Sequence, residues 1–125
     1  MTNHGLAVAL ESLAGAAAVP VQLDVDLPGR LPEPVEVAAY YVVSESLTNA
    51  GKHARATSVN VQVRRAGDAV LVVVADDGVG GADPATGSGL RGLSDRVEAL
   101  GGRLSVVTSP DGTVVTAEIP CLNSG

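Results

Sequence analysis

Aromatic side chains are almost absent from the sequence. Tyr40 and Tyr41 are the only two, and there is no tryptophan or phenylalanine. Because 46% of the residues are nonetheless hydrophobic, mainly Ala, Val and Leu, the core must be aliphatic. Valine is β-branched and favours strands, so the composition already predicts strand-rich structure.

Cationic side chains, cysteines and long apolar runs are also scarce. Eight Lys and Arg stand against 14 Asp and Glu, which gives a net charge of −6. Direct nucleic-acid binding is therefore not expected, because neutralising phosphates requires a basic patch. The single cysteine, Cys121, cannot form an internal disulfide, which fits a reducing compartment. No apolar run approaches the ~20 residues that span a bilayer, and the first residues lack the basic start of a signal peptide.

Helical periodicity appears in three segments of a chain whose length suits one domain over residues 1–125. Leucines at helical spacing predict a first helix that ends before Pro20. The longest helical pattern runs from Val35 to about Ala54, with Pro34 near its first turn. A third helix is predicted from Leu90 to Leu100, closed by the glycines that follow it.

Alternating and continuous apolar runs predict strands between these helices. The predicted strands are Val21–Leu27, Thr57–Arg64, Ala69–Ala75, Leu104–Thr108 and Thr113–Ile119. Short turns such as Ala66-Gly67-Asp68 join neighbouring strands into hairpins. The resulting order, α β α β β α β β, predicts an α+β fold. We expect a two-layer α/β sandwich, with a mixed, mostly antiparallel sheet of about five strands covered on one face by about three helices.

The first motif with chemical potential lies on the long helix. Its members fall in one narrow stripe, with apolar residues on the opposite face: Glu45, Asn49, Lys52 and His53. The set suits a magnesium nucleotide, because an amide oxygen can bind Mg²⁺, an ammonium can neutralise phosphate and a carboxylate can accept a proton. A solvated polar face would have the same pattern, so the stripe alone leaves both interpretations open.

The second motif is Asp76-Asp77-Gly78-Val79-Gly80, directly after an apolar strand. An aspartate in this place can accept a hydrogen bond from an exocyclic amine, and the glycines allow backbone to approach a flat ring closely. Asp-Gly is also an ordinary choice for a tight turn, and the motif alone does not decide between the two.

The third motif, Gly87-Ser88-Gly89-Leu90, leads into a helix, an arrangement that favours phosphate. With Arg91 and Gly92 it also matches GxGxxG, and Asp111 lies at a plausible distance for a ribose-binding acid. The dinucleotide-binding interpretation is disfavoured by context, because residues 81–86 form no strand before the motif and the following helix leads into a hairpin.

Taken in order, the three motifs resemble the GHKL-type ATPases, which share the Bergerat fold. Within that group, the sequence resembles the sensor histidine kinases that work with NarL/LuxR-type regulators. The asparagine box is Glu45–Ala54, the glycine boxes are Asp76–Gly80 and Gly87–Val97, and Gly112-Thr113 matches a late glycine–threonine pair. The resemblance covers residues 6–120.

The resemblance implies a role for each motif residue. Asp76 would bind the adenine amino group, Gly78 and Gly80 would shape the pocket under the ring, and Thr113 would support the adenine site. Asp77 stands where Asn is common in the family and is expected to face away from the ring.

The phosphate half of the site would come from the other two motifs. Asn49 would hold Mg²⁺ against the phosphates, and Lys52 or His53 would contact phosphate or ribose. The second glycine box would close over the triphosphate through Gly87, Gly89 and Leu90. The lid between the glycine boxes is short and lacks a phenylalanine box, which matches the regulator subgroup named above.

The resemblance also implies catalysis on a separate domain. Glu45, with Asn49, would serve the transfer by helping to activate an acceptor imidazole. Neither histidine is expected to be that acceptor, because His53 belongs to the asparagine box and His4 has no room for a helical hairpin before it. The chain is therefore interpreted as a catalytic domain without its dimerisation domain, with residues 1–18 the remnant of a junction helix. It would bind ATP and Mg²⁺ but not phosphorylate itself.

Two protein partners follow from the resemblance: the acceptor-histidine dimerisation domain of the parent kinase and a NarL/LuxR-type response regulator. A cytoplasmic location is implied, with a membrane anchor in the parent protein left open. A stand-alone serine kinase of the anti-sigma-factor type is an alternative, as is a nucleotide-binding module without catalysis. The Arg91–Arg96 stretch and the short lid favour the histidine kinase, and the intact Glu45 and Asn49 argue against a module without catalysis.

Overall fold

The computed structural model describes residues 5–17, 19–27, 31–52, 57–78, 88–109 and 111–121. Within these ranges the elements, in chain order, are α1 (Gly5–Ala16), β1 (Val21–Asp26), α2 (Glu33–Lys52), β2 (Val59–Ala66), β3 (Ala69–Asp76), α3 (Ser88–Ala99), β4 (Arg103–Ser109) and β5 (Gly112–Pro120). The predicted order of helices and strands is confirmed. Each predicted element has its counterpart, and the boundaries differ by one or two residues.

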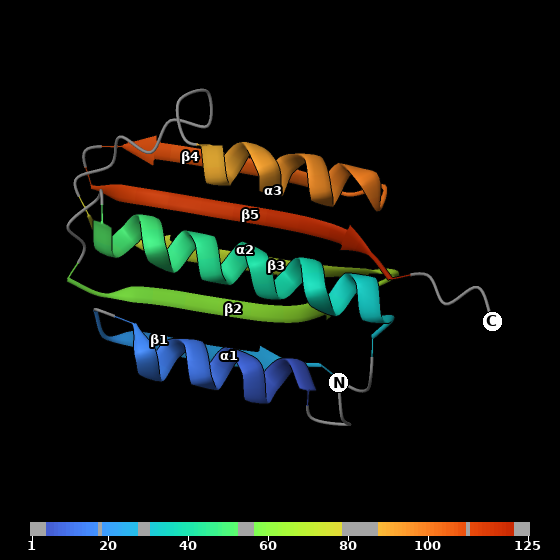
Figure 1. Ribbon diagram of the computed structural model, residues 1–125, viewed down its shortest axis with the longest axis horizontal. Helices are drawn as coiled ribbons and strands as arrows, with labels where there is room; N and C mark the ends of the chain where they lie inside the picture. Colours follow the sequence, from blue (N-terminus) through green and yellow to red (C-terminus); the bar gives the residue numbers. More distant parts are fainter. Residues whose placement is uncertain are drawn as a thin grey trace.

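The five strands form one sheet in the order β1-β2-β3-β5-β4. β1 pairs with β2 in parallel, and the other three pairings are antiparallel. All three helices lie on the same face of this sheet, with α1 over the β1 edge, α2 over the centre and α3 over the β4 edge (Figure 1). The fold is the α+β two-layer sandwich that the sequence predicts.

The core lies between the sheet and the helices and is built from aliphatic side chains. Alternate residues of the central strands are buried there, in line with the period of two that strands impose. They include Val59, Val61 and Val63 of β2, Val70, Val72 and Val74 of β3, and Val115, Ala117 and Ile119 of β5. The helices contribute Leu6 and Leu10 of α1, Val42, Val43 and Ala50 of α2, and Val97 of α3. α1 is thus part of the packed core of the domain.

α2 begins two residues earlier than the predicted start at Val35. The carbonyl oxygen of Pro32 accepts hydrogen bonds from the amides of Val35 and Glu36 at 3.0 and 3.1 Å, so the helix starts at Glu33. Pro34 fits within this first turn because the amides there have no partner inside the helix, so a missing N–H costs nothing.

The end of α3 follows the prediction from its glycines. Gly101 has a φ of 83°, its amide donates to the Glu98 carbonyl at 2.9 Å, and the Gly102 amide donates to the Val97 carbonyl at 3.0 Å. This pair of bonds is the Schellman arrangement, which satisfies the last carbonyls of a helix. It turns the chain directly into β4. None of the described helices is long and apolar enough to cross a membrane.

Candidate functional site

The described residues of the three motifs lie at one end of the sheet. The C-terminus of α2, the end of β3, the start of β5 and the N-terminus of α3 all lie at the left-hand end of the view in Figure 1. They meet there because β3 and β5 are antiparallel neighbours, so the last residue of one stands beside the first residues of the other.

α2 presents its polar stripe at this end while burying its other side. Val43 and Leu47 are buried in the core, whereas Glu45 and Asn49 are half-buried. The predicted division of the helix into two faces is confirmed for these residues. Lys52 closes α2, but its side chain lies outside the described part, as does the whole of His53.

Asp76 is the final residue of β3 and points toward the helix layer, since it continues the alternation of Val72 and Val74. Its Oδ1 accepts a hydrogen bond from the Gly78 amide at 2.9 Å. This local turn fixes the carboxylate at the mouth of the core, half-buried, and leaves Oδ2 as a second acceptor in the same place. An acceptor held this way can accept a hydrogen bond from an exocyclic amine.

Thr113 stands directly opposite Asp76 in the β3–β5 register. The side chain is 3% exposed, and within the described residues its Oγ1 has no hydrogen-bond partner. A buried hydroxyl without a partner costs about 1–3 kcal/mol of stability, so native proteins usually supply one. The pairing of a fixed carboxylate with an unpartnered hydroxyl fits the polar edge of a bound purine, with or without a bridging water.

Gly112, the residue before Thr113, lies very close to the end of β3. Its φ is +149°, and a Cβ built on it would lie 2.0 Å from the Asp76 carbonyl oxygen. Only glycine allows β5 to pass this close to the end of β3. Gly112 therefore holds Thr113 and Asp76 side by side.

Asp77 is directed away from this pocket, as the sequence resemblance implied. Its carboxylate accepts hydrogen bonds from Thr57 and Ser58, the two residues just before β2. The sequence pattern alone did not point to Thr57 and Ser58 as partners of Asp77. Two adjacent hydroxyl residues at a strand start were the available signal, because such residues often bind a nearby carboxylate.

The phosphate half of the predicted site lies mostly outside the described residues. Gly80 and Gly87 belong to residues 79–87, which the structure does not describe. Gly89 and Leu90 fall in the first turn of α3, and nothing is described of their side chains. Their assignments remain predictions, as does that of His53. Within the described ranges, no group of three or more His, Cys, Asp or Glu residues is arranged as a metal site.

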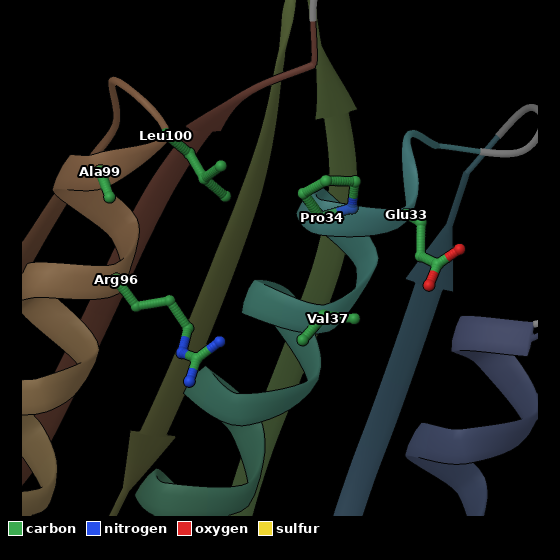
Figure 2. A pocket seen from close by; sticks show the side chains of 6 residues that line it. All are labelled: Glu33, Pro34, Val37, Arg96, Ala99 and Leu100. Carbon is green, nitrogen blue, oxygen red and sulfur yellow. The ribbon is translucent and has the colours of Figure 1, made fainter.

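A groove at the opposite end of the molecule lies between α2 and α3 (Figure 2). It is lined by Glu33, Pro34, Val37, Arg96, Ala99 and Leu100. Arg96 reaches across from α3, and its guanidinium lies 4.7 Å from the ring centroid of Tyr41. Because the groove contains no predicted site residue and lies at the N-terminal end of α2, it is separate from the Asp76 pocket.

Comparison with known proteins shows the family of the chain. Residues 35–123 match the model of the histidine kinase-, DNA gyrase B- and HSP90-like ATPase family. The chain belongs to this ATPase family. The matched segment contains every residue placed at the pocket above.

Individual relatives place the chain near the ATPase domain of sensor histidine kinases. It is 40% identical over 95 residues to the signal transduction histidine-protein kinase/phosphatase DegS of Brevibacillus brevis, covering 73% of this chain and 25% of DegS. It is 36% identical over 96 residues to the oxygen sensor histidine kinase NreB of Staphylococcus carnosus, covering 73% of this chain and 28% of NreB. The chain thus spans about a quarter of the length of these relatives.

A solved structure extends the similarity to nearly the whole chain. The histidine kinase domain of the blue-light activated kinase EL346 from Erythrobacter litoralis superimposes with a TM-score of 0.65 and 29% identity, covering 93% of this chain and 57% of that one. The fold of this chain excludes the dinucleotide-binding interpretation of Gly87–Gly92. α3, which begins within that motif, leads into the antiparallel β4–β5 hairpin rather than a parallel strand, and Asp111 lies in the turn of that hairpin.

Proposed function

We propose that this chain binds ATP with Mg²⁺ and donates the γ-phosphoryl group to a histidine on a separate dimerisation domain, as the catalytic part of a two-component sensor histidine kinase. The observation that supports it best is the Asp76–Thr113 pair: a carboxylate fixed by the Gly78 amide beside a buried hydroxyl that has no hydrogen-bond partner among the described residues. Both groups suit the amino edge of adenine.

The remaining roles divide between adenine and phosphate. Gly78 and Gly80 shape the floor of the pocket, and Asn49 provides an amide oxygen for Mg²⁺ one helical turn beyond Glu45. Lys52 and His53 contact phosphate or ribose. Gly87, Gly89 and Leu90 close over the triphosphate, where the amides at the start of α3 favour anions.

Bound ATP supplies the phosphoryl group, and the protein supplies position and charge. Glu45 lies on the same stripe as Asn49 and is half-buried, so its carboxylate can take up the proton of an acceptor imidazole. The acceptor must come from another domain, since His53 is assigned to nucleotide binding. Residues 1–18 are proposed as the end of the helix that joins the two domains.

The proposed partners are the acceptor-histidine domain of the parent kinase and a response regulator of the NarL/LuxR type, in the cytoplasm. The likeness to DegS and NreB, both named as histidine kinases, favours this assignment over a serine kinase. The intact Glu45 and Asn49 favour it over a module that only binds nucleotide.

Calorimetric titration with ATP and Mg²⁺ tests the proposal, with NAD as the negative control. In Asp76→Asn, an amide replaces the acceptor, and the lost charge-assisted hydrogen bond is worth roughly 1.5–3 kcal/mol, or about 10- to 100-fold in affinity. Asp68→Asn, an exposed aspartate in the β2–β3 turn, is the matched control and should bind ATP normally. Wild-type affinity in Asp76→Asn would refute the adenine assignment.

A second measurement tests the kinase activity itself. The chain is mixed with a separately produced acceptor domain and radiolabelled ATP, and acid-labile, base-stable label on that domain is the expected product. Acid-stable label on a serine would instead favour the anti-sigma-type alternative. ATP binding without phosphoryl transfer to histidine or serine would leave only the nucleotide-binding module.

A further inference from the structure

The carboxylate of Asp77 is surrounded by donors from a single dipeptide. Its Oδ1 accepts the backbone amides of Thr57 and Ser58 at 2.7 and 3.0 Å. Its Oδ2 accepts the Thr57 hydroxyl and, at 3.4 Å, the Ser58 hydroxyl. One side chain thus receives both main-chain and side-chain donors of two consecutive residues.

These contacts extend the β2–β3 pairing past its last regular pair. The ladder ends at Val59 and Asp76, and the next step is the hydrogen bond from the Asp77 amide to the Ser58 carbonyl at 3.4 Å. Among the described residues, no backbone carbonyl accepts from the Thr57 and Ser58 amides, which lie just before β2. Asp77 therefore continues the sheet with its side chain where the backbone ladder stops.

The position of Asp77 determines what this attachment controls. Consecutive strand residues face opposite sides, so Asp76 faces the nucleotide pocket while Asp77 faces the other way. The two residues share a peptide unit, and the Gly78 amide that binds Asp76 Oδ1 follows immediately. Fixing Asp77 therefore fixes the backbone from which the Asp76 carboxylate and the Gly78 amide project.

Thr57 and Ser58 also follow the connection from α2, the helix that carries Asn49. The Asp77 contacts join the end of that connection to the end of β3. They link the part of the chain assigned to Mg²⁺ with the part assigned to adenine.

We propose that Asp77 is a positioning residue for nucleotide binding, which holds Asp76 and Gly78 in their binding geometry by anchoring them to Thr57 and Ser58. This inference rests on the proposed ATP binding at Asp76. The same hydrogen bonds lower the pKa of Asp77 to about 2, first through the Thr57 hydroxyl and then through the two amides, so the carboxylate is ionised at any physiological pH.

Two substitutions of Asp77 separate positioning from other effects. Asp77→Ala removes all acceptors, and we expect about tenfold weaker ATP binding, measured by calorimetry well below the melting temperature, because small misplacements of binding groups are costly. Asp77→Asn keeps Oδ1 for the two amides, so its affinity should stay within about twofold of wild type. Asp68→Ala is the charge-matched control at the other end of the hairpin and should not change affinity.

Amide hydrogen exchange without nucleotide separates a local effect on Asp76 and Gly78 from a general loss of stability. In Asp77→Ala, the exchange rates of the Ser58 and Gly78 amides should rise at least tenfold more than those of Val61 and Val72 in the core, which change only through the lower global stability. Equal acceleration at all four amides would mean that Asp77 only stabilises the fold, and would overturn the proposal.

The outcomes distinguish this inference from the proposed function. If wild type binds ATP and Asp77→Ala binds equally well, the positioning role is wrong and the ATP site stands. If Asp77→Asn loses as much affinity as Asp77→Ala, the contacts to the two amides are not what positions Asp76 and Gly78, and the proposal is overturned. If wild type does not bind ATP, the proposed function fails and this inference fails with it.

Discussion

Replacing Gly112 by alanine tests the close approach of β5 to the end of β3. The added Cβ would lie 2.0 Å from the Asp76 carbonyl oxygen, 3.1 Å from the Asp76 carbonyl carbon and 3.3 Å from the Asp77 Cα. All three atoms are backbone, so no side-chain rotation can relieve the overlap. The strands must separate locally, at the pair that joins Asp76 to Thr113.

The expected cost of Gly112→Ala has two parts. A φ of +149° is a conformation that L-residues rarely adopt, which costs about 1–3 kcal/mol. Overpacking against fixed backbone adds roughly 1–3 kcal/mol. The sum, about 2–6 kcal/mol, is a large share of the roughly 5–15 kcal/mol that stabilises a typical domain. ATP affinity should also fall in the folded variant, because the displaced atoms belong to Asp76.

Urea unfolding followed by far-ultraviolet circular dichroism measures this cost, since the chain has no tryptophan. Gly67→Ala is the matched control: its φ is +62°, but a Cβ there meets nothing within 4 Å. It should lose only the backbone strain of about 1–2 kcal/mol. If the two variants lose the same free energy of unfolding, the tight contact between Gly112 and Asp76 plays no part in stability and the reasoning is refuted.

Three further predictions concern single groups of the site. Asn49→Asp should weaken Mg²⁺-dependent ATP binding in calorimetry, and an unchanged metal dependence would exclude Asn49 as the ligand. Thr113→Val should leave the urea midpoint equal or higher, because it removes a buried unpartnered hydroxyl, while ATP affinity falls by about three- to tenfold; unchanged affinity would remove Thr113 from the site. The pKa of Asp77 is lowered from 3.8 to about 2, so its contribution to stability is complete above 3.8 and is lost as pH falls toward 2. Asp77→Asn should flatten acid unfolding in that window, and an unchanged acid profile would count against these hydrogen bonds.

The sheet was predictable because its signal is local and repeated. Alternation in Val59–Val63 and the continuous apolar run of β3 each specify a strand, and Asp-Gly at residues 111–112 specifies the turn between β4 and β5. With almost no aromatic residues, the core consists of many small aliphatic side chains. Each strand must therefore contribute several of them, which makes its apolar pattern visible in the sequence. The polar stripe on α2 was equally predictable, because a helix with 3.6 residues per turn places Asn49 and Leu47 on opposite faces.

β2 begins two residues later than the predicted strand, because Thr57 and Ser58, which precede it, have another partner. Their amides donate to the Asp77 carboxylate, 20 and 19 residues away. No local pattern contains this contact. The same holds for Gly112, whose need for glycine comes from the Asp76 carbonyl on the neighbouring strand rather than from the turn alone.

The location of the pocket at one end of the sheet follows from the fold and explains how polar groups coexist with an aliphatic core. Asp76 and Thr113 occupy the last and second positions of antiparallel neighbours, so they meet without interrupting the valine rows behind them. Arg96 lines the groove between α2 and α3, near the N-terminal end of α2 and away from Asp76 and Thr113 (Figure 2). Its cation–π contact with Tyr41 is exposed and worth about 0.5–1 kcal/mol. Arg96→Ala should therefore cost little stability and leave ATP affinity unchanged; a large loss of affinity would show that the two ends of the domain are coupled through α3.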